Sequence, residues 1–492
     1  MNDTAVFFGS TLASCMRPKG VRCLRTFSGS HDTTGLTPTC GTIPADLAGR
    51  LYRIGPGRFE DEAGPFAHWF DGEGLMTCID FAEGKVATAS RLIRPGETTK
   101  AQLSARGRFG RAPAGRWRCL RSLFDPDLYV NPANTALMFW QGRLFALYEG
   151  GLPKEIDPDT LDTIGETTLG VVKRGFGAHP KSYRPTGALI NQGFRFPGRP
   201  YLDYFSLDAT GVARTLTSVP FSGSLLNHVF AVTDRYIVSL CPPLFSDPFA
   251  IMAQQKPSSQ ALRWKPEAGT EVLVTPTDRL ADTRRLKTDA FFYSHTANAF
   301  DDGDEIVIHG AVAADAGAMD WIASIRVGAT SLASSTIGRM SEIRIKPKTG
   351  ELQQRPLADC PFDYPVIDPR LTGRRHRFIY GVGFRDERCA YQDLFDCVLR
   401  LDTRDGTATK CDFGEGHFAS EPIFVPRSAD CGEGQGWLTC VNYDSDADES
   451  YVAIIDSEAM TKIAMISFGR PLPMSFHGLW LDRSELTAGS LS

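Results

Sequence analysis

The sequence predicts an all-β protein of the radially repeated kind, a β-propeller. Short apolar segments with period-two alternation follow one another from Cys40 onward, for example "RLFALYE", "DEIVIHGAV" and "YVAIIDSE". Turn sequences such as "QGR", "DDGD" and "RDGT" separate them, and helical periodicity is almost absent. Radial repetition protects the edges of so many strands, so about six to eight blades of roughly 60 residues fit the length.

No linker divides residues 40–492, which we interpret as one propeller domain preceded by an N-terminal extension, residues 1–39. The first thirty residues are basic and rich in small and hydroxylated side chains. This composition fits either an organellar transit peptide (plastid or mitochondrion) or a disordered extension of a cytoplasmic protein, and both interpretations stay open.

The composition is that of an ordinary water-soluble chain, with 23% charged residues and a net charge of −5. This charge gives no basic footprint for nucleic acid. No stretch approaches the roughly 18 consecutive apolar residues of a membrane span, which leaves a cytoplasmic or peripheral membrane protein. The twelve cysteines form no C-x-x-C pair, so a thiolate zinc site is not indicated.

Histidine is scarce, with nine residues in all, and four of them share a setting. These four stand beside apolar or aromatic residues next to a predicted strand: His179, His228, His295 and His477. The inner strands of different propeller blades meet at one axis, so residues this far apart in the sequence can converge there. Imidazole binds iron, copper, nickel and zinc. Taken alone, the residues leave open both a four-histidine metal centre and four ordinary core histidines.

Eight motifs in order resemble those of the carotenoid cleavage oxygenases, a family that includes lignostilbene dioxygenases and the retinal isomerohydrolase of the pigment epithelium. They are "GRLYRIGPGRFE", "HWFDGEGLM", "LYEGGLPKEIDPDTLDTIG", "AHPK", "NHVFAVTDRYIV", "HTANAFDDGDE", "SEPIFVPR" and "FHGLW". The resemblance runs from about Gly41 to Leu481. It implies a seven-bladed propeller, capped on one face by loops and short helices, with a metal on the axis.

The resemblance also implies the metal and its ligands. One non-haem Fe(II) per chain would be held by His179, His228, His295 and His477. Three carboxylates would accept the outer N–H groups of three of these rings: Glu149, Asp363 and Glu421. Asp363 departs from the family, which usually has Glu there, so a backbone shift or a bridging water is expected to make up for its shorter arm.

Thr135 matches the position at which the family sets a small β-branched side chain beside the iron. Its methyl group would obstruct one open iron position and leave the other to O2. A plain strand threonine is the alternative interpretation.

The resemblance implies a dioxygenase that cleaves one carbon–carbon double bond of a lipophilic conjugated alkene with O2. No organic cofactor is expected, since no G-x-G-x-x-G unit stands between a strand and a helix. Leu92 stands where stilbene-cleaving relatives would have a tyrosine, which favours a carotenoid or apocarotenoid. Stilbenoid cleavage, ester cleavage with isomerisation, and a non-catalytic scaffold are the alternatives, in falling order.

Two segments near the surface carry further expectations. Residues 241–252, "CPPLFSDPFAIM", predict either a membrane-contacting entrance for the substrate or a cover of the propeller face. The fifteen residues after His477 are expected to tolerate removal better than the histidine tolerates substitution, with Leu479 and Trp480 as exceptions.

Overall fold

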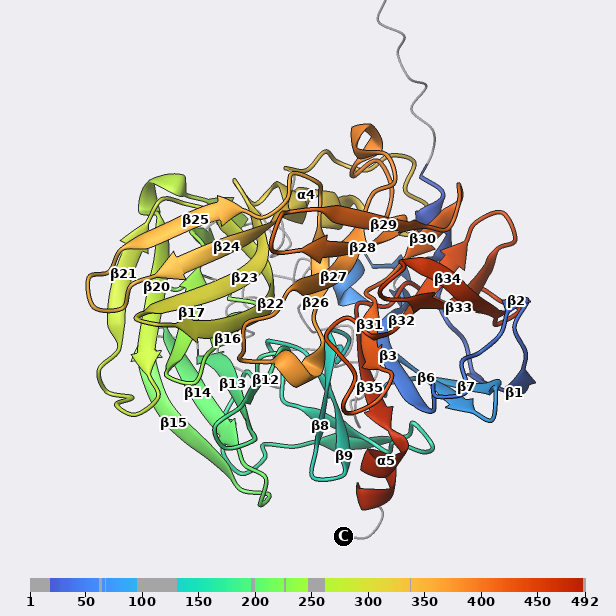
Figure 1. The fold of residues 1–492 in the computed structure, drawn as a ribbon, viewed down its shortest axis with the longest axis horizontal. Helices are drawn as coiled ribbons and strands as arrows, with labels where there is room; N and C mark the ends of the chain where they lie inside the picture. The colour runs from blue at the N-terminus through green and yellow to red at the C-terminus, as the bar shows by residue number, and fades with distance from the viewer. Residues whose placement is uncertain are drawn as a thin grey trace, which may run out of the picture.

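The computed structural model describes residues 18–61, 64–66, 68–94, 131–195, 200–224, 227–246, 262–336 and 338–489, and the structural statements below concern these residues. Its main feature is a ring of seven antiparallel sheets, which confirms the predicted all-β, seven-bladed propeller (Figure 1). Helices are few and short, with α4 (Gly317–Ser324) and α5 (Arg483–Gly489) as the α-helices among the described residues.

The blades follow the order of the chain, apart from the strands that close the ring. The first blade pairs β1 (Ser30–Leu36), β7 (Lys85–Leu92), β6 (Glu73–Ala82), β3 (Gly49–Arg58) and β35 (His477–Asp482). The second pairs β11 (Thr163–Glu166), β10 (Lys154–Ile156), β9 (Arg143–Leu147) and β8 (Ala136–Trp140). The third pairs β12 (Lys181–Tyr183), β13 (Ala188–Arg195), β14 (Tyr201–Leu207) and β15 (Ala213–Pro220). The fourth pairs β16 (Phe230–Val232), β17 (Tyr236–Cys241), β20 (Thr270–Pro276) and β21 (Arg284–Thr288).

The remaining three blades complete the ring. The fifth pairs β22 (Phe292–Asp302), β23 (Glu305–Ala313), β24 (Arg339–Ile345) and β25 (Leu352–Pro356). The sixth pairs β26 (Asp363–Val366), β27 (Phe378–Gly383), β28 (Cys397–Asp402) and β29 (Ala408–Asp412). The seventh pairs β2 (Cys40–Gly41), β34 (Thr461–Ser467), β33 (Glu449–Asp456), β32 (Gly436–Asp444) and β30 (His417–Ala419), with β31 (Ile423–Pro426) also on β32.

The core lies between neighbouring blades and around the axis. Period-two alternation sends side chains from both faces of each sheet against the next one. Between the fourth and fifth blades, for example, Val238 and Val272 pack with Ile306 and Ile343, all fully buried. Contacts between blades also join the inner strands, such as β16 with β22 and β31 with β35, so these strands surround the axis.

The two chain ends close the ring. The last strand, β35, pairs with β3 in the first blade, with His477 opposite Ile54. The N-terminal strand β2 pairs with β34 in the seventh blade, with Cys40 opposite Met465. Each of these two blades therefore contains strands from both ends of the chain, which fixes the first blade against the last.

The N-terminal extension expected for residues 1–39 is shorter in the structure. Residues 30–36 form β1 on the outer edge of the first blade, and the short 3₁₀ helix η1 (Gly20–Cys23) packs Cys23 into the core. The sequence of β1, "SHDTTGL", shows no apolar alternation, because β1 is an edge strand whose side chains are mostly exposed. Residues 1–17, which include part of the predicted targeting segment, lie outside the described residues.

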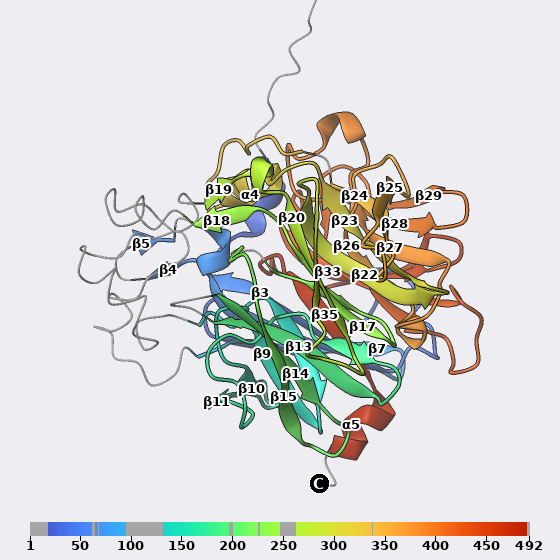
Figure 2. The same cartoon turned by 90° about the vertical axis from the view of Figure 1, so that its left-hand side faces the viewer.

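Several small elements stand outside the seven sheets, together on one side of the propeller (Figure 2). They are the hairpins β4 (Glu60–Asp61)–β5 (Gly64–Pro65) and β18 (Leu244–Ser246)–β19 (Leu262–Trp264), with α4. Four further 3₁₀ turns lie in loops: η2 (Trp69–Asp71), η5 (Pro266–Ala268), η6 (Pro369–Leu371) and η7 (Glu387–Cys389). The predicted membrane-contacting segment 241–252 is described only as far as Ser246. No helix among the described residues has the length and apolar character of a membrane span.

A buried histidine pair joins the fifth and sixth blades. His309 on β23 and His376, before β27, place Nδ1 and Nε2 3.1 Å apart. The other ring nitrogen of His309 lies 3.3 Å from a carboxylate oxygen of Glu342, and that of His376 lies 3.0 Å from Nδ2 of Asn298. Both rings are nearly inaccessible, although His376 stands between two arginines in the sequence.

The pair predicts a pH-dependent stability. Burial, with the neighbouring His309, lowers the pKa of His376 to about 3. An unfolded histidine has a pKa of about 6.5, so between these values the unfolded chain binds a proton that the folded chain does not. We expect His376 to lower the free energy of unfolding by about 1.4 kcal/mol per pH unit as the pH falls below about 6.5. Chemical denaturation at pH 7.5, 6.0 and 5.0 should show a shallower pH slope for His376→Gln than for the wild type. Equal slopes would contradict the prediction that His376 is neutral in the folded protein and protonated in the unfolded chain over this pH range.

The end of the chain is less dispensable than the sequence indicated. Strand β35 continues to Asp482, and Leu481 is its most buried apolar side chain, at 2% exposure, while Leu479 and Trp480 are partly exposed. Leu481 packs in a cluster with Tyr52 and Met76 from the same blade. Removal of the residues after His477 would delete nearly all of the closing strand, so the structure does not favour the expected tolerance to this truncation, which stays a prediction.

Leu481→Ala should lower the free energy of unfolding by about 3 kcal/mol, since it removes a buried side chain and leaves a cavity. The matched control is Ile164→Ala, at a side chain that is 62% exposed, and it should change stability little. Urea denaturation of both variants measures the difference. A Leu481→Ala protein as stable as the control would show that β35 is not needed to close the ring.

Candidate metal centre

Four histidines meet on the propeller axis. His179 lies in the extended chain just before β12, His228 just before β16, His295 inside β22, and His477 at the start of β35. They thus come from the inner edges of the third, fourth, fifth and first blades. One ring nitrogen of each lies within 4.8 Å of one in every other ring.

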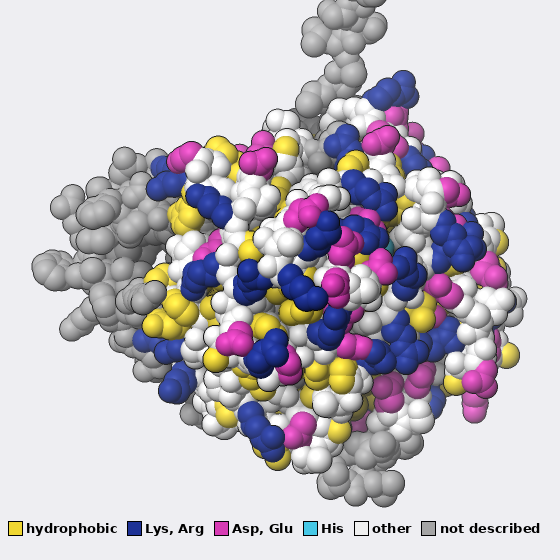
Figure 3. Space-filling view, turned by 60° about the vertical axis from the view of Figure 1, so that its left-hand side comes forward, with side chains coloured by type: hydrophobic (Ala, Val, Ile, Leu, Met, Phe, Trp, Pro, Cys, Tyr) yellow, Lys and Arg dark blue, Asp and Glu magenta, His cyan; other side chains and the backbone are white. Residues whose placement is uncertain are grey.

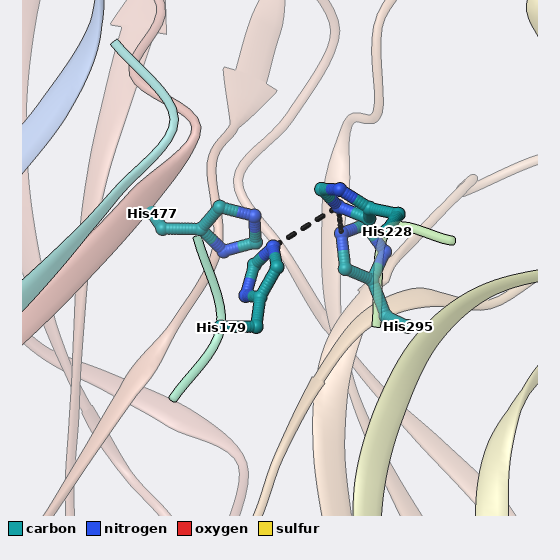
Figure 4. Close-up of side chains that lie close together, drawn as sticks. All are labelled: His179, His228, His295 and His477. Carbon is teal, nitrogen blue, oxygen red and sulfur yellow. Dashed lines mark hydrogen bonds between the residues drawn. The ribbon is translucent and has the colours of Figure 1, made fainter. Parts of the chain in front are cut away.

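The close approach is between Nε2 atoms. Nε2 of His228 lies 3.0 Å from Nε2 of His179 and 3.4 Å from Nε2 of His295 (Figure 4). The ring centres of His179 and His477 are 4.6 Å apart. Figure 4 shows the four rings turned toward one region between them.

Carboxylates hold the outer nitrogens of three rings. Nδ1 of His228 contacts Oε1 of Glu149, which follows β9. Nδ1 of His295 lies 2.7 Å from Oδ1 of Asp363, and Nδ1 of His477 lies 2.8 Å from Oε1 of Glu421. A carboxylate accepts and does not donate, so Nδ1 carries the proton in each ring and Nε2 presents its lone pair inward.

Asp363 reaches His295 directly, despite its shorter side chain. A bulge in the pairing of β26 with β27 lies between Asp363 and Val366, and Tyr364 adopts a positive φ of 51°. The carboxylate also accepts hydrogen bonds from Oγ of Ser294 at 3.2 Å and from the amide of Tyr364 at 2.8 Å. The irregular backbone of β26 accompanies this direct contact, so the geometry needs no bridging water.

Glu421 is fixed from the opposite side by a buried arginine. Arg53 on β3 is 2% exposed, and its guanidinium donates to the carbonyl of Glu421 at 3.0 Å, with Oε2 of the same residue 3.5 Å away. It also donates to Oγ of Ser420 at 3.0 Å, Oγ of Ser475 at 3.0 Å and the carbonyl of Phe476 at 3.3 Å. One side chain thus ties the first blade, the seventh blade and the segment that leads to His477.

Gly478 leaves room for this arginine. It stands opposite Arg53 in the register of β3 with β35, and its amide donates to Oε2 of Glu421 at 2.8 Å. A Cβ at position 478 would lie 2.7 Å from Nη1 of Arg53. The glycine after the histidine is therefore required by packing against the guanidinium.

The electrostatics favour neutral rings for His179 and His477, and ionised carboxyls. Burial, and then the neighbouring His228 and His477, lower the pKa of His179 well below the ordinary value. Burial likewise lowers the pKa of His477. Burial works against ionisation of Glu149, but the contact with His228 outweighs it, so the pKa of this carboxyl lies below its ordinary value. Neutral imidazole is the form that binds a metal ion.

The donor set fits a cation. The Nε2 lone pairs of His228 and His295, 3.4 Å apart, would repel each other without a positive charge between them. Two histidine nitrogens about 2.1 Å from one ion and at a right angle to each other lie about 3.0 Å apart. Within the described residues, no carboxylate or thiol belongs to the group, so the ligands would be four neutral imidazoles.

Thr135 lies directly before β8 and is buried. Its amide donates to the carbonyl of Leu147 at 3.0 Å, and its hydroxyl donates to Oδ1 of Asn134 at 3.2 Å. These contacts lie within its own blade, so its role beside the metal stays a prediction.

Three residues around the centre were missed in the sequence. Arg53 and Lys181 stand inside quoted motifs without a role, and Tyr364 stacks on His295 with 4.8 Å between ring centres. The signal for Arg53 was its charge in the middle of an apolar strand. Lys181 follows His179 by two residues, and burial lowers its pKa to about 8. The stacking of Tyr364 accompanies its positive φ, and no residue pattern in the sequence predicts that backbone conformation.

Known proteins match the chain over almost its full length. A family model described as retinal pigment epithelial membrane protein matches residues 26–482. The chain is 30% identical to the apocarotenoid-15,15'-oxygenase of Synechocystis sp. over 457 residues, which cover 89% of this chain and 91% of that protein. It is 26% identical to the carotenoid 9,10(9',10')-cleavage dioxygenase 1 of Arabidopsis thaliana, covering 92% of this chain and 88% of that protein.

The fold comparison agrees with the sequence comparisons. The crystal structure of cobalt-substituted Synechocystis ACO superposes with a TM-score of 0.84 at 27% identity, covering 94% of this chain and 98% of that chain. The family expected from the ordered motifs is thereby confirmed. The chain belongs to the carotenoid cleavage oxygenase family, the family of the retinal pigment epithelial membrane protein.

Proposed function

We propose that this protein is a non-haem, Fe(II)-dependent dioxygenase that cleaves one carbon–carbon double bond of a carotenoid or apocarotenoid into two carbonyl products. The observation that carries the proposal is the convergence of four neutral imidazoles on the propeller axis, three of them held by carboxylates. The names of the relatives support the substrate class.

Four neutral nitrogen donors differ from the two-histidine, one-carboxylate set of many non-haem iron enzymes. The carboxylates of Glu149, Asp363 and Glu421 contact the outer nitrogens of three rings and would not bind the metal themselves. They keep the proton on each Nδ1. Ferrous iron held by the four rings would supply the one-electron chemistry that lets O2 react with an alkene. The role of the chain is to hold four lone pairs at fixed positions.

Aromatic side chains next to the centre suit a conjugated substrate. Phe476, which precedes His477, contacts Trp69 with ring centres 4.8 Å apart. Tyr364 lies against His295 and also approaches Phe395, with ring centres 6.2 Å apart. Apolar walls of this kind exclude water and bind an extended polyene along its faces.

The proposed reaction balances without a reductant. The double bond breaks, each of its two carbons gains one oxygen atom of O2, and the four electrons that reduce O2 come from the alkene. Thr135 would leave one open metal position less accessible than the other.

We further propose that the protein takes its lipophilic substrate from a membrane surface on the side of β18 and β19. Phe245, Leu262 and Trp264 of this hairpin are partly exposed, and the ammonium of Lys265 lies 5.8 Å from the ring centre of Phe245. Figure 3 shows hydrophobic side chains on the left of the molecule, with Lys and Arg side chains beside them. Apolar side chains flanked by cations suit the interface of an anionic membrane.

Isotope labelling tests the reaction. The iron-loaded protein, given a β-apo-carotenal under ¹⁸O2 with rapid reduction of the aldehydes, should place one labelled oxygen in each fragment. Parallel incubations with resveratrol and with a retinyl ester test the stilbenoid and isomerohydrolase alternatives. Cleavage without label, or turnover of resveratrol but not of the apocarotenal, would contradict the proposal.

Metal binding tests the ligands. His477→Ala should lose at least a hundredfold in affinity for Fe(II) or Co(II), because it removes one ligand of four. Glu421→Gln should lose about ten- to a hundredfold, since it weakens the hold on His477. His31→Ala is the matched control, because His31 lies on the outer strand β1 and should leave metal content unchanged. Full metal content in the His477→Ala protein would contradict the assignment.

A further inference from the structure

Lys181 is a charged residue beside the centre for which the proposed reaction has no use. It opens the inner strand β12, two residues after His179 on extended chain. Alternate residues of an extended chain face the same side and lie about 7 Å apart, so Lys181 lies on the same, axial side as His179. An electrostatic interaction between Lys181 and His179 agrees with this placement.

The other blades have no charge at the matching place. The positions two residues after Thr135, His228, His295, Asp363, Glu421 and His477 are all apolar. They are Leu137, Phe230, Ala297, Pro365, Ile423 and Leu479. A cation in the third blade is therefore not a general requirement of an inner strand.

Among the residues that the structure describes, none neutralises the ammonium of Lys181 by a direct contact. Within the described parts of the chain, no hydrogen bond or ion pair holds it, and its charge interacts with Glu421 only at a longer distance. By contrast, the buried lysine of β10, Lys154, lies 3.2 Å from the carbonyl of Arg94 and 3.3 Å from that of Asn131. Lys181 is partly buried, so the field of its charge is screened less than that of a fully exposed lysine.

The four histidines thus have unequal surroundings. His228 and His295 each donate to a carboxylate that no guanidinium or ammonium contacts among the described residues. The carboxylate behind His477 is shared with Arg53, and His179 has no carboxylate partner in the described structure but has Lys181 beside it. A carboxylate makes an imidazole a stronger donor, so His179 is the weakest donor of the four.

We propose that Lys181 is a positioning residue whose charge, acting beside His179, disfavours the higher charge of the oxidised metal and so keeps the centre in its reduced state. This inference rests on the proposed iron function. A positive charge near the metal raises the free energy of Fe(III) more than that of Fe(II), and it also weakens the binding of any dication. The charge of Lys181 therefore lowers the affinity of the centre for the metal and raises its reduction potential.

Metal titration and redox potentiometry at pH 7 and low salt test the inference. Lys181→Met and Lys181→Gln should bind Co(II) about tenfold more tightly than the wild type, because a nearby positive charge is gone. The Fe(III)/Fe(II) midpoint potential, followed by the ferric electron paramagnetic resonance signal, should shift downward in both variants. Lys181→Arg keeps the charge and should behave as the wild type.

Lys410→Met is the matched control for loss of a partly buried lysine. Its ammonium is held by the carbonyls of Phe384 and Arg385 on the sixth blade, at 3.0 and 3.3 Å, so the variant should change stability without moving the potential. A wild type that binds neither cobalt nor iron would refute the metal proposal itself. A wild type that binds both, with neutral variants of unchanged or weaker affinity and unchanged potential, would refute the role of Lys181 alone.

Discussion

The hydrogen bond from His477 to Glu421 is the interaction on which the rest of the centre depends. It crosses from the last strand of the chain to the seventh blade. Arg53 on the first blade donates to the carbonyl of Glu421 and to that of Phe476, the residue before His477. Because β35 closes the ring by pairing with β3, the same strand completes the fold and brings the fourth imidazole to the axis. The strand that closes the propeller therefore also completes the centre.

The other two carboxylates repeat this arrangement elsewhere in the ring. Asp363 of the sixth blade holds His295 of the fifth, and Glu149, between β9 and β10 of the second blade, holds His228 at the edge of the fourth. Each contact therefore joins two blades and also sets the tautomer of one ring. A rigid set of lone pairs follows from blade packing, so little reorganisation is needed when a cation binds.

The charges around the axis are arranged to receive a dication. Three carboxylates lie behind the rings, and two cations, Arg53 and Lys181, lie near His477 and His179. Without a metal ion the carboxylates outnumber the cations, and a dication reverses the balance. The distribution is uneven, with the cations on the side of the first and third blades, which makes the four imidazoles unequal donors.

Much of the architecture could be predicted from the sequence, because alternation and turn residues are local signals. The four histidines and the three carboxylates could be placed together only through the ordered motifs. The contacts of Arg53 could not be predicted, since its partners Glu421, Ser475 and Phe476 are hundreds of residues away along the chain. The reach of Asp363 depends on a bulge, and the ordered part of the N-terminus on an edge strand without apolar alternation.

The burial of histidines outside the metal centre also could not be predicted from their neighbours in the sequence. His376 stands between two arginines in the sequence, yet the structure buries it against His309 between two blades. Leu481 likewise has a larger share in closing the ring than Leu479 or Trp480, because register decides which side of β35 faces the core.

The central claim is that the axis holds one metal ion through four imidazoles and no anionic ligand. A crystal structure of the anaerobically Fe(II)-loaded protein, supported by X-ray absorption at the iron edge, tests it most directly. We expect one ion with Nε2 of His179, His228, His295 and His477 each about 2.1 Å away. The three carboxylates should accept hydrogen bonds from Nδ1 atoms and should not bind the ion. An ion bound by a carboxylate oxygen, or by fewer than four of these histidines, would contradict it.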